Sequence, residues 1–403
     1  MMGRVSELID IATARRTVLE SVGRLGAEQV PVVEALGRIL AEDVQSDGDV
    51  PPFDSSAMDG YAVVPGPARQ LRVAGESRAG HPADRGPAAG EALAISTGAM
   101  VPAQTELAVV PVERVRECGD GVVAVPESEP GANVRRAGED VRAGAAVLPA
   151  GIALGPPELA VAVAAGRARL RCSLRPRVAV LVTGDELVDP GQPIGPGQIR
   201  SSNGVAVAAQ AAVAGAEVVG SEIVRDDAEA TAGALARALE EADVVCVSGG
   251  VSVGPHDHVR PALKRLGVEE RFWGVSLRPG KPTWFGVRGG AAVFGLPGNP
   301  VSAIVTFHLF ARPALRRLAG TDPDDTRTAA LLDAPAMRDP RRDQVLRCSL
   351  SAEPDGWHVT PAPKQGSHIL TSMLGARALA LVPAGEGELG SGSRVAVELL
   401  SSW

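Results

Sequence analysis

Two acidic stretches offer ligands for a metal ion beside donors for an anion. In TGDEL (183–187), the backbone N–H groups of Thr183 and Gly184 could contact an anion, while Asp185 and Glu186 supply the hard oxygens that Mg²⁺ prefers. In RDD (225–227), Asp226 or Asp227 follows an apolar run and could reach the same place. Ordinary interpretations stay open, namely solvated acids at a strand end and an Asp helix N-cap.

SGGVSVGPHDHV (248–259) has the composition of a phosphate-binding loop. Glycines allow close backbone approach and positive φ, and hydroxyls add donors. The candidate contacts are Ser248, Gly249, Gly250 and Ser252, with Asp257 at a predicted helix start. The stretch is neither G-x-x-x-x-G-K-[ST] nor a convincing G-x-G-x-x-G, which disfavours a P-loop NTPase or a dinucleotide-binding protein. His256 and His258 are interpreted as turn or surface residues.

A second group of residues could capture an oxyanion. Arg278 and Lys281 flank a Pro-Gly turn in SLRPGKP (276–282), which fixes the spacing of two cations. Only three of the chain's 40 basic residues are lysines, so a lysine in this turn is informative. Pro297 and Pro300 form a rigid turn before a helix whose N-terminus favours anions, although a plain tight turn explains PGNP equally well. Together these stretches indicate phosphate-ester or anhydride chemistry that depends on Mg²⁺.

The pattern from about 174 to 325 predicts the element that positions these loops. Continuous apolar strands, such as RVAVLV and DVVCVS, alternate with helices, as in AEATAGALARALEEA. This alternation is typical of a doubly wound α/β domain with a parallel sheet. Ligands bind beyond the carboxyl ends of the strands in such a sheet, where the loops above begin.

Three further regions surround that domain. Apolar spacing predicts helices over 6–22 and from Pro31 through Leu40, and PPELAVAVAAGRA predicts another that ends near Gly166. Short Val-rich runs broken by Gly and Pro predict an inserted β-rich domain at 45–137. Two hairpin-like pairs predict a small C-terminal β-barrel domain at 326–403. We therefore expect four domains. They are a helical and extended N-terminal domain (1–44 with 138–173), the inserted β-rich domain (45–137), the α/β domain (174–325) and the C-terminal β-barrel (326–403).

Composition excludes several classes of protein. A net charge of -8 and a pI near 5.4 argue against general nucleic-acid binding. Four scattered cysteines indicate neither a disulfide framework nor a zinc site. Neither a signal peptide nor an apolar run of about 18 residues is present, so we expect a cytoplasmic protein without a membrane span.

The motifs, taken together, resemble the MoeA family, the molybdopterin molybdenumtransferases, which includes the gephyrin E domain. The motifs that match, in family order, are SAMDGYA, STGAMVP, RRAGEDV, TGDEL, SGGVSVG-x-x-D, PGKP, GLPGNPVSA and QGSHI. The resemblance implies insertion of molybdate into adenylyl-molybdopterin, with Mg²⁺-dependent release of AMP to give molybdenum cofactor. It also implies a homodimer whose active cleft is shared between subunits.

The resemblance assigns roles to individual positions. Catalytic carboxylates are implied at Asp59, Asp140, Glu186, Asp226 and Asp257, of which the last three are the candidates for Mg²⁺. Substrate binding is implied at Thr97, Pro297 and Pro300. The residues that we expect to capture the oxyanion are Arg278, Lys281, Arg347 and Ser367. Thr183, Ser248, Gly249, Gly250 and Ser252 complete the predicted substrate site. Asp59-Gly60 by itself is typical of a turn that needs positive φ at the glycine.

One departure from the family concerns FWGVSLRPGKP. The family often has lysine where this chain has Gly274 and Arg278, so one cation is absent and another has become a guanidinium. Two alternatives stay open, a molybdopterin adenylyltransferase, which shares the TGDE and SGG loops, and an interaction scaffold of the gephyrin type.

The implied shared cleft predicts complementation between variants. Asp59→Asn and Lys281→Ala homodimers should each lose activity, whereas a mixed preparation should regain part of it because one cleft per mixed dimer keeps both residues. Turnover of co-expressed variants measures this. Mixed dimers as inactive as the parents would instead assign both residues to one subunit's site.

Overall fold

The computed structural model describes residues 8–103, 106–250 and 257–400. By packing, the chain divides into two units, one formed by the segment up to Glu28 together with Ser173 onward, and the other by Gln29–Cys172. α1 therefore groups with the α/β domain rather than with the rest of the predicted 1–44 segment. The finer division into four domains stays a prediction, as does the cytoplasmic location.

A six-stranded sheet organises the α/β part of the first unit and confirms the predicted doubly wound domain. Its strands, in spatial order, are β16 (Glu217–Val224), β13 (Arg177–Thr183), β17 (Val244–Ser248), β21 (Ala291–Leu296), β20 (Trp284–Arg288) and β18 (Glu269–Trp273). The first four are parallel, β20 pairs antiparallel with β21, and the edge strand β18 pairs antiparallel with β20. The short parallel pair β14 (Leu187–Val188) and β15 (Ile199–Arg200) follows β13.

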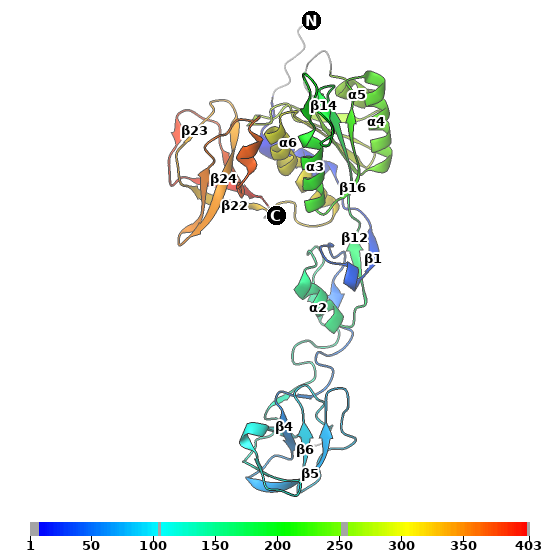
Figure 1. Ribbon diagram of the computed structural model, residues 1–403, viewed down its shortest axis with the longest axis vertical. Helices are drawn as coiled ribbons and strands as arrows, with labels where there is room; N and C mark the ends of the chain where they lie inside the picture. Colours follow the sequence, from blue (N-terminus) through cyan, green and yellow to red (C-terminus); the bar gives the residue numbers. More distant parts are fainter. Residues whose placement is uncertain (1–7, 104–105, 251–256, 401–403) are drawn as a thin grey trace. The chain divides into compact units, whose positions relative to one another are not determined.

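Helices cover both faces of this sheet (Figure 1). One face packs against α1 (Ile11–Ser21), α3 (Ser202–Val213), α6 (Pro300–Thr306), the π-helical turn η3 (Phe307–Ala311) and α7 (Arg312–Leu318). The other packs against α4 (Ala228–Glu241) and α5 (Val259–Arg265). The central strands β13, β17 and β21 are buried on both sides, which is why their sequences are apolar without alternation.

The C-terminal part confirms the predicted small β-barrel. Its strands, in order, are β24 (Asp343–Glu353), β25 (Gly356–Pro361), β22 (Arg327–Leu332), β28 (Arg394–Leu399) and β26 (Ala378–Val382), and β26 pairs with β24 to close the sheet. The two predicted hairpin-like pairs are the antiparallel pairs β24–β25 and β26–β28. Smaller elements are β23 (Ala336–Met337), β27 (Glu388–Leu389) and the 3-10 helix η4 (Leu370–Met373). β19 (Leu277–Arg278) pairs in parallel with β24 and so ties the Lys281 turn to the barrel.

The second unit contains the β-rich insertion. Its six-stranded sheet has the order β7 (Ala108–Pro111), β4 (Gly60–Val63), β6 (Glu91–Ile95), β5 (Arg69–Ser77), β9 (Val122–Val125) and β8 (Arg116–Glu117), with the 3-10 turn η2 (Val112–Arg114) after β7. Two-stranded pairs join β1 (Ala27–Pro31) to β12 (Arg169–Ser173), β2 (Val44–Gln45) to β11 (Ala146–Leu148) and β3 (Ser55–Ser56) to β10 (Val134–Arg135). α2 (Pro156–Ala164) is the predicted helix, and Gly166 follows it with φ 88°.

The helix predicted from Pro31 through Leu40 is wrong. Only the 3-10 turn η1 (Val32–Glu34) forms there. Gly37 takes φ 72°, which interrupts helical geometry, and Ile39 and Leu40 pair with strand-like segments instead. Ile39 and Leu40 are buried as a helix would bury them, whereas Leu36, which the helical spacing places on the same face, is exposed.

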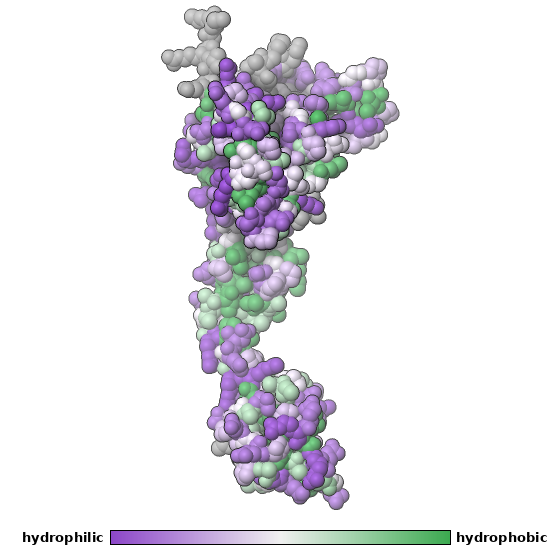
Figure 2. All heavy atoms as spheres, turned by 90° about the vertical axis from the view of Figure 1, so that its left-hand side faces the viewer, coloured by the Kyte–Doolittle hydropathy of each residue, from purple (hydrophilic) through white to green (hydrophobic). Residues whose placement is uncertain are grey.

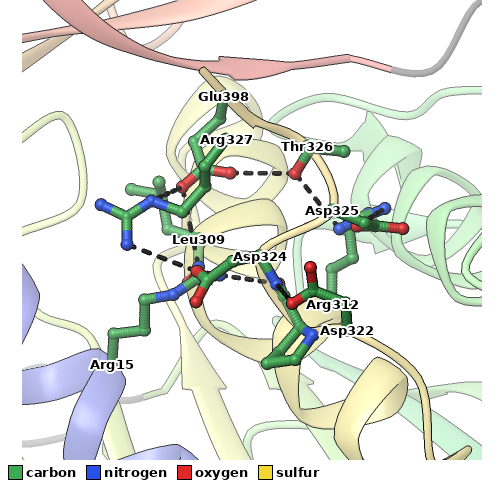
Figure 3. A network of polar contacts seen from close by, with 10 residues as sticks. Arg15, Leu309, Arg312, Asp322, Asp324, Asp325, Thr326, Arg327 and Glu398 are labelled. Atoms are coloured by element: carbon green, nitrogen blue, oxygen red, sulfur yellow. Dashed lines mark hydrogen bonds and ion pairs between the residues drawn. The ribbon is translucent and has the colours of Figure 1, made fainter. Parts of the chain in front are cut away.

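A buried ionic network joins α1, η3 and the barrel (Figure 3). Arg15 is 6% exposed and donates to the carbonyl of Leu309 at 3.0 Å and to the Asp324 carboxylate at 2.6 Å. Glu398 of β28 is 3% exposed and forms ion pairs with the Arg15 guanidinium at 3.7 Å and with Arg327 Nε at 3.2 Å. It also accepts a hydrogen bond from the Thr326 hydroxyl at 3.0 Å. Burial raises the pKa of Glu398 despite these cations. The carboxylate thus depends on Arg15 for compensation of its buried charge.

Arg15→Met should therefore lower the free energy of unfolding by about 3 kcal/mol, because it leaves Glu398 buried with one cation fewer. Urea unfolding at neutral pH measures the change. Arg16→Ala, on the exposed side of the same helix, is the matched control and should stay within about 0.5 kcal/mol of wild type. Equal effects of the two variants would contradict a special role for the buried pair.

Candidate functional site

A hollow of about 360 Å³ lies at the carboxyl ends of β13 and β17, where the sheet predicts a ligand site. Many of the predicted residues line it, namely Thr183, Glu186, Asp226, Ser248, Gly249, Gly250, Asp257 and Pro300. Four segments far apart in the sequence therefore converge on one cavity. Predicted Ser252 lies outside the described residues, as does His256.

Two glycines allow the loop after β17 to approach the end of β13. Gly249 has φ 93°, and a Cβ there would lie 2.6 Å from the carbonyl oxygen of Thr183. Gly250 has φ 59°, and its Cβ would lie 2.9 Å from Thr183 Oγ1. Both the backbone conformation and the space exclude a side chain. The predicted use of glycine for positive φ and close approach is confirmed at both positions.

The hollow also contains residues that sequence reasoning missed. Asn203, at the start of α3, is 9% exposed, and its amide donates to Ser248 Oγ at 2.9 Å and to the Gly298 carbonyl at 2.8 Å. It fixes the loops after β17 and β21 to one another. Arg200, Ser201 and Ser202 line the wall beside it. A polar run IRSSN directly before a predicted helix was the available signal, because helix N-termini favour anions.

The three carboxylates of the hollow differ in environment. Asp226 and Asp185 are joined by two hydrogen bonds, each from the backbone N–H of one to the carboxylate of the other. The Asp185 N–H donates to Asp226 Oδ2 at 3.4 Å, and the Asp226 N–H donates to Asp185 Oδ1 at 3.2 Å. Both oxygens of Asp257 are buried, and within the described ranges neither accepts a hydrogen bond of full geometry. Burial raises the pKa of Asp257. Burial of this carboxylate therefore costs folding free energy, which a bound cation could offset.

The donor set suits a cation that keeps part of its water shell. Among the described residues, no three acidic, His or Cys side chains gather closely enough to enclose a metal ion. Mg²⁺ usually keeps several waters and uses one or two carboxylates together with substrate phosphates. Asp257, Glu186 and Asp226 line the same hollow and fit that manner of binding. The backbone N–H groups of Val259 and Arg260 partly offset the burial of Asp257, although neither makes a hydrogen bond of full geometry.

The predicted oxyanion residues lie outside the hollow, on the Lys281 turn and within the barrel. Ser367 of QGSHI contacts the PGNP turn: its hydroxyl accepts from the Asn299 amide at 3.1 Å, and its carbonyl accepts from the Val301 N–H at 3.2 Å. Lys281 is exposed, and no partner for its ammonium is found in the part of the chain that the structure describes. Arg278 is 62% exposed and lies 3.8 Å from Asp339. Neither cation lines the hollow described above.

Arg347 has a different environment from the other predicted cations. It is 1% exposed, and its guanidinium donates to the Ser372 hydroxyl at 3.3 Å and to the carbonyls of Lys364 and Gly366 at 3.4 Å. Burial lowers its pKa. These contacts hold the QGSHI loop from beneath.

Three predicted residues belong to the second unit. Asp59 is exposed, and its carboxylate accepts from the Thr97 N–H at 2.6 Å and the Thr97 hydroxyl at 2.9 Å. These hydrogen bonds lower the pKa of Asp59. Asp140 is exposed and its N–H donates to the Val50 carbonyl at 3.1 Å. The structure thus brings Asp59 and Thr97 together, as one carboxylate with a fixed orientation.

The expected positive φ at Gly60 is wrong, because Gly60 is not among the residues with positive φ. It begins β4 and pairs with Pro111 of β7. A Cβ at Gly60 would overlap the backbone carbonyl of Val110, so close strand approach requires this glycine.

Comparison with known proteins matches the whole architecture. Residues 9–166 match the family profile "MoeA N-terminal region (domain I and II)", residues 179–317 match "Probable molybdopterin binding domain", and residues 329–400 match "MoeA C-terminal region (domain IV)". The chain is 36% identical to "Molybdopterin molybdenumtransferase 2" of Mycobacterium tuberculosis, covering 95% of this chain and 97% of that protein.

Two further similarities agree with this match. The chain is 39% identical to "Molybdopterin molybdenumtransferase" of Haemophilus influenzae over 78% of each chain. A crystal structure of a molybdopterin biosynthesis MoeA protein from Pyrococcus horikoshii superposes with a TM-score of 0.84 at 33% identity, covering 98% of this chain and 100% of that one.

Asp257→Asn should separate stability from function. The folded-state pKa of Asp257 is raised, so its ionised form opposes folding once the pH exceeds the unfolded pKa of about 3.9. The amide should raise the free energy of unfolding by about 1 kcal/mol at pH 7 while abolishing ligand binding in the hollow. The gain should disappear near pH 3, where the wild-type group is protonated in both states.

Denaturant unfolding at pH 7 and pH 3 measures this difference. Asp227 caps α4 by accepting from the N–H groups of Glu229 and Ala230, so Asp227→Ala is the contrasting control and should lose stability at pH 7. An Asp257→Asn variant that is less stable than wild type at pH 7 would show that the carboxylate has a structural partner.

Proposed function

This chain belongs to the MoeA family, and from that membership we propose that it is a molybdopterin molybdenumtransferase, which inserts molybdate into adenylyl-molybdopterin and releases AMP to give molybdenum cofactor. The observation that carries the proposal is the hollow at the sheet edge, where two glycine-containing loops, serine hydroxyl groups and the Arg200 cation gather beside three carboxylates. A phosphate-bearing substrate and a divalent cation require that combination.

The hollow offers separate surfaces to the parts of such a substrate. Val182, Leu187 and Ile199 give it apolar walls. The hydroxyl groups of Ser201 and Ser202 line the hollow as donors to phosphate, and Arg200 adds a cation at the wall. Asn203 fixes the positions of these loops before substrate arrives, so little reorganisation is needed on binding.

Glu186, Asp226 and Asp257 are the residues that would hold Mg²⁺. When bound, the ion would neutralise charge on the phosphate that is cleaved. Asp257 contributes the carboxylate whose oxygens are unpaired among the described residues, so ion binding would compensate its burial. Asp226 is oriented by its exchange with Asp185.

Molybdate capture is proposed at the Lys281 turn and the QGSHI loop. Lys281 and Arg278 supply exposed positive charge, and Ser367 supplies a hydroxyl that is already fixed by Asn299. Arg347 acts by positioning the loop from beneath, since its guanidinium is directed to loop carbonyls. An oxyanion would then meet cations on one side and a hydroxyl on the other.

Homodimerisation is part of the proposal. In the second unit, exposed apolar residues gather around η1 and α2, as Figure 2 shows, and they include Val33 at 84% exposure, Leu36 at 58% and Val163 at 58%. In the first unit, α3 leaves Val205 and Val213 exposed at 60% and 49%. Exposed apolar surface of this kind marks interaction sites. A partner subunit would supply Asp59, Thr97 and Asp140 to the cleft.

The proposal predicts that the purified protein releases AMP from adenylyl-molybdopterin, and that both molybdate and Mg²⁺ increase the rate. Lys281→Ala should raise the apparent KM for molybdate by about tenfold, because loss of a charge-assisted contact costs about 1.5 kcal/mol. Chromatographic quantification of AMP over a molybdate titration measures both.

Lys264→Ala is the matched control, since this exposed lysine of α5 does not line the hollow. It should leave the KM for molybdate unchanged. Absence of molybdate-stimulated AMP release in the wild type would overturn the proposal, and ATP-dependent adenylylation of molybdopterin by this chain would favour the adenylyltransferase alternative.

A further inference from the structure

The segment Leu8–Asp10, directly before α1, pairs with the stretch that leads into the Lys281 turn. Ile9 forms a parallel bridge with Val275. The Ser276 N–H donates to the Ile9 carbonyl at 2.7 Å, and the Ile9 N–H donates to the Gly274 carbonyl at 3.4 Å. These residues are more than 250 positions apart in the sequence, so the pairing is purely tertiary.

Leu8 fills the space that a side chain at position 274 would need. Gly274 has φ 89°, and a Cβ there would lie 2.7 Å from Leu8 Cδ2. Any larger residue would displace Leu8 as well as strain the backbone. In this chain, the Leu8 side chain therefore occupies the space in which a lysine side chain at position 274 would begin.

The same stretch transmits its position to the turn itself. The Val275 N–H donates to the Lys281 carbonyl at 2.9 Å, which closes the loop 275–281 on itself. On its other side, Ser276 Oγ donates to the Arg341 carbonyl at 2.9 Å and the Asp343 N–H donates to the Ser276 carbonyl at 3.1 Å. Residues 275–276 thus lie between the N-terminal segment and the barrel.

The N-terminal segment is itself anchored. Asp10 caps α1 by accepting from the Thr13 N–H at 2.6 Å, and Arg15, in the next turn, is tied to Leu309 and Asp324. A continuous set of hydrogen bonds therefore leads from the buried ionic network through Asp10 and Ile9 to the Lys281 turn. Packed and hydrogen-bonded elements of this kind carry positional restraint between distant residues.

We propose that Leu8–Asp10 is a positioning element for anion capture, which holds the Lys281 turn in register with the barrel. The inference rests on the proposed function, since it names the support of that same oxyanion site. Without the segment, residues 275–276 keep their contacts to the barrel on one side only. The Lys281 ammonium then samples more positions, and a misplacement of about 1 Å can cost about 100-fold in rate.

Two truncations of the full chain provide the test. Removal of residues 1–9 deletes the pairing, whereas removal of residues 1–7 keeps Leu8–Asp10 and is the matched control. We expect the longer truncation to raise the KM for molybdate about tenfold while the KM for adenylyl-molybdopterin stays unchanged, because only the turn is released. The shorter truncation should match wild type in both constants.

A pair of glycine substitutions serves if the longer truncation does not fold. Gly274→Ala should displace Leu8 and raise the KM for molybdate in the same selective way. Gly289→Ala places the same residue at φ 58° in open space and should leave both KM values unchanged. Hydrogen exchange of the peptide containing residues 274–282 should quicken in Gly274→Ala and in the longer truncation, and not in the two controls.

The outcomes distinguish the inference from the proposed function. The inference alone is overturned if the wild-type protein shows molybdate-stimulated AMP release but the KM for molybdate is unchanged in Gly274→Ala and in the folded longer truncation. A rise in both KM values by the same factor also overturns it, since that indicates a general structural defect. A wild-type protein without molybdate-stimulated AMP release overturns the proposed function and the inference with it.

Discussion

The close approach of Gly249 to Thr183 is the constraint on which the candidate site depends. Parallel strands β13 and β17 end at the same edge, and the loop after β17 could not approach Thr183 if it carried a side chain at position 249. Two glycines with positive φ turn this loop across the end of β13. The hollow follows from that turn, and Asn203 then fixes it from α3.

The buried ionic network has a comparable role for the second group of residues. The barrel contacts the α/β domain through short elements, of which β19 has two residues. Apolar packing alone would give such a junction little directional preference. Arg15 provides direction, because its guanidinium must satisfy a carbonyl of η3, the Asp324 carboxylate and the charge of Glu398 at the same time. A buried cation with these partners permits few alternative arrangements of α1 and β28.

Stability and function oppose each other at Asp257 and support each other at Asp59. The oxygens of Asp257 are buried and unpaired within the described ranges, so the folded chain holds that carboxylate against its tendency to neutralise. Asp59 is exposed and accepts two hydrogen bonds from Thr97, which favour its ionised form. The family resemblance assigned both residues the same kind of role, yet the first fits a ligand that brings positive charge and the second fits a permanently ionised acceptor.

The sequence by itself determined the class of each domain and the identity of most residues around the hollow. The signals that predicted these features are local: continuous apolar strands, glycine-rich loops at their ends and the family motifs. They predict the structure correctly because a strand end and its loop are adjacent in the chain. Tertiary structure decided what local signals cannot carry. The stretch 31–40 has helical spacing but forms strand-like pairs, Gly60 is required by a neighbouring strand rather than by its own φ, and Arg347 lies beneath a loop. Asn203 gained its role from two loops distant in sequence, and Leu8–Asp10 from a turn more than 250 residues away, because hydrogen-bond partners and excluded volume are fixed only when the chain has folded.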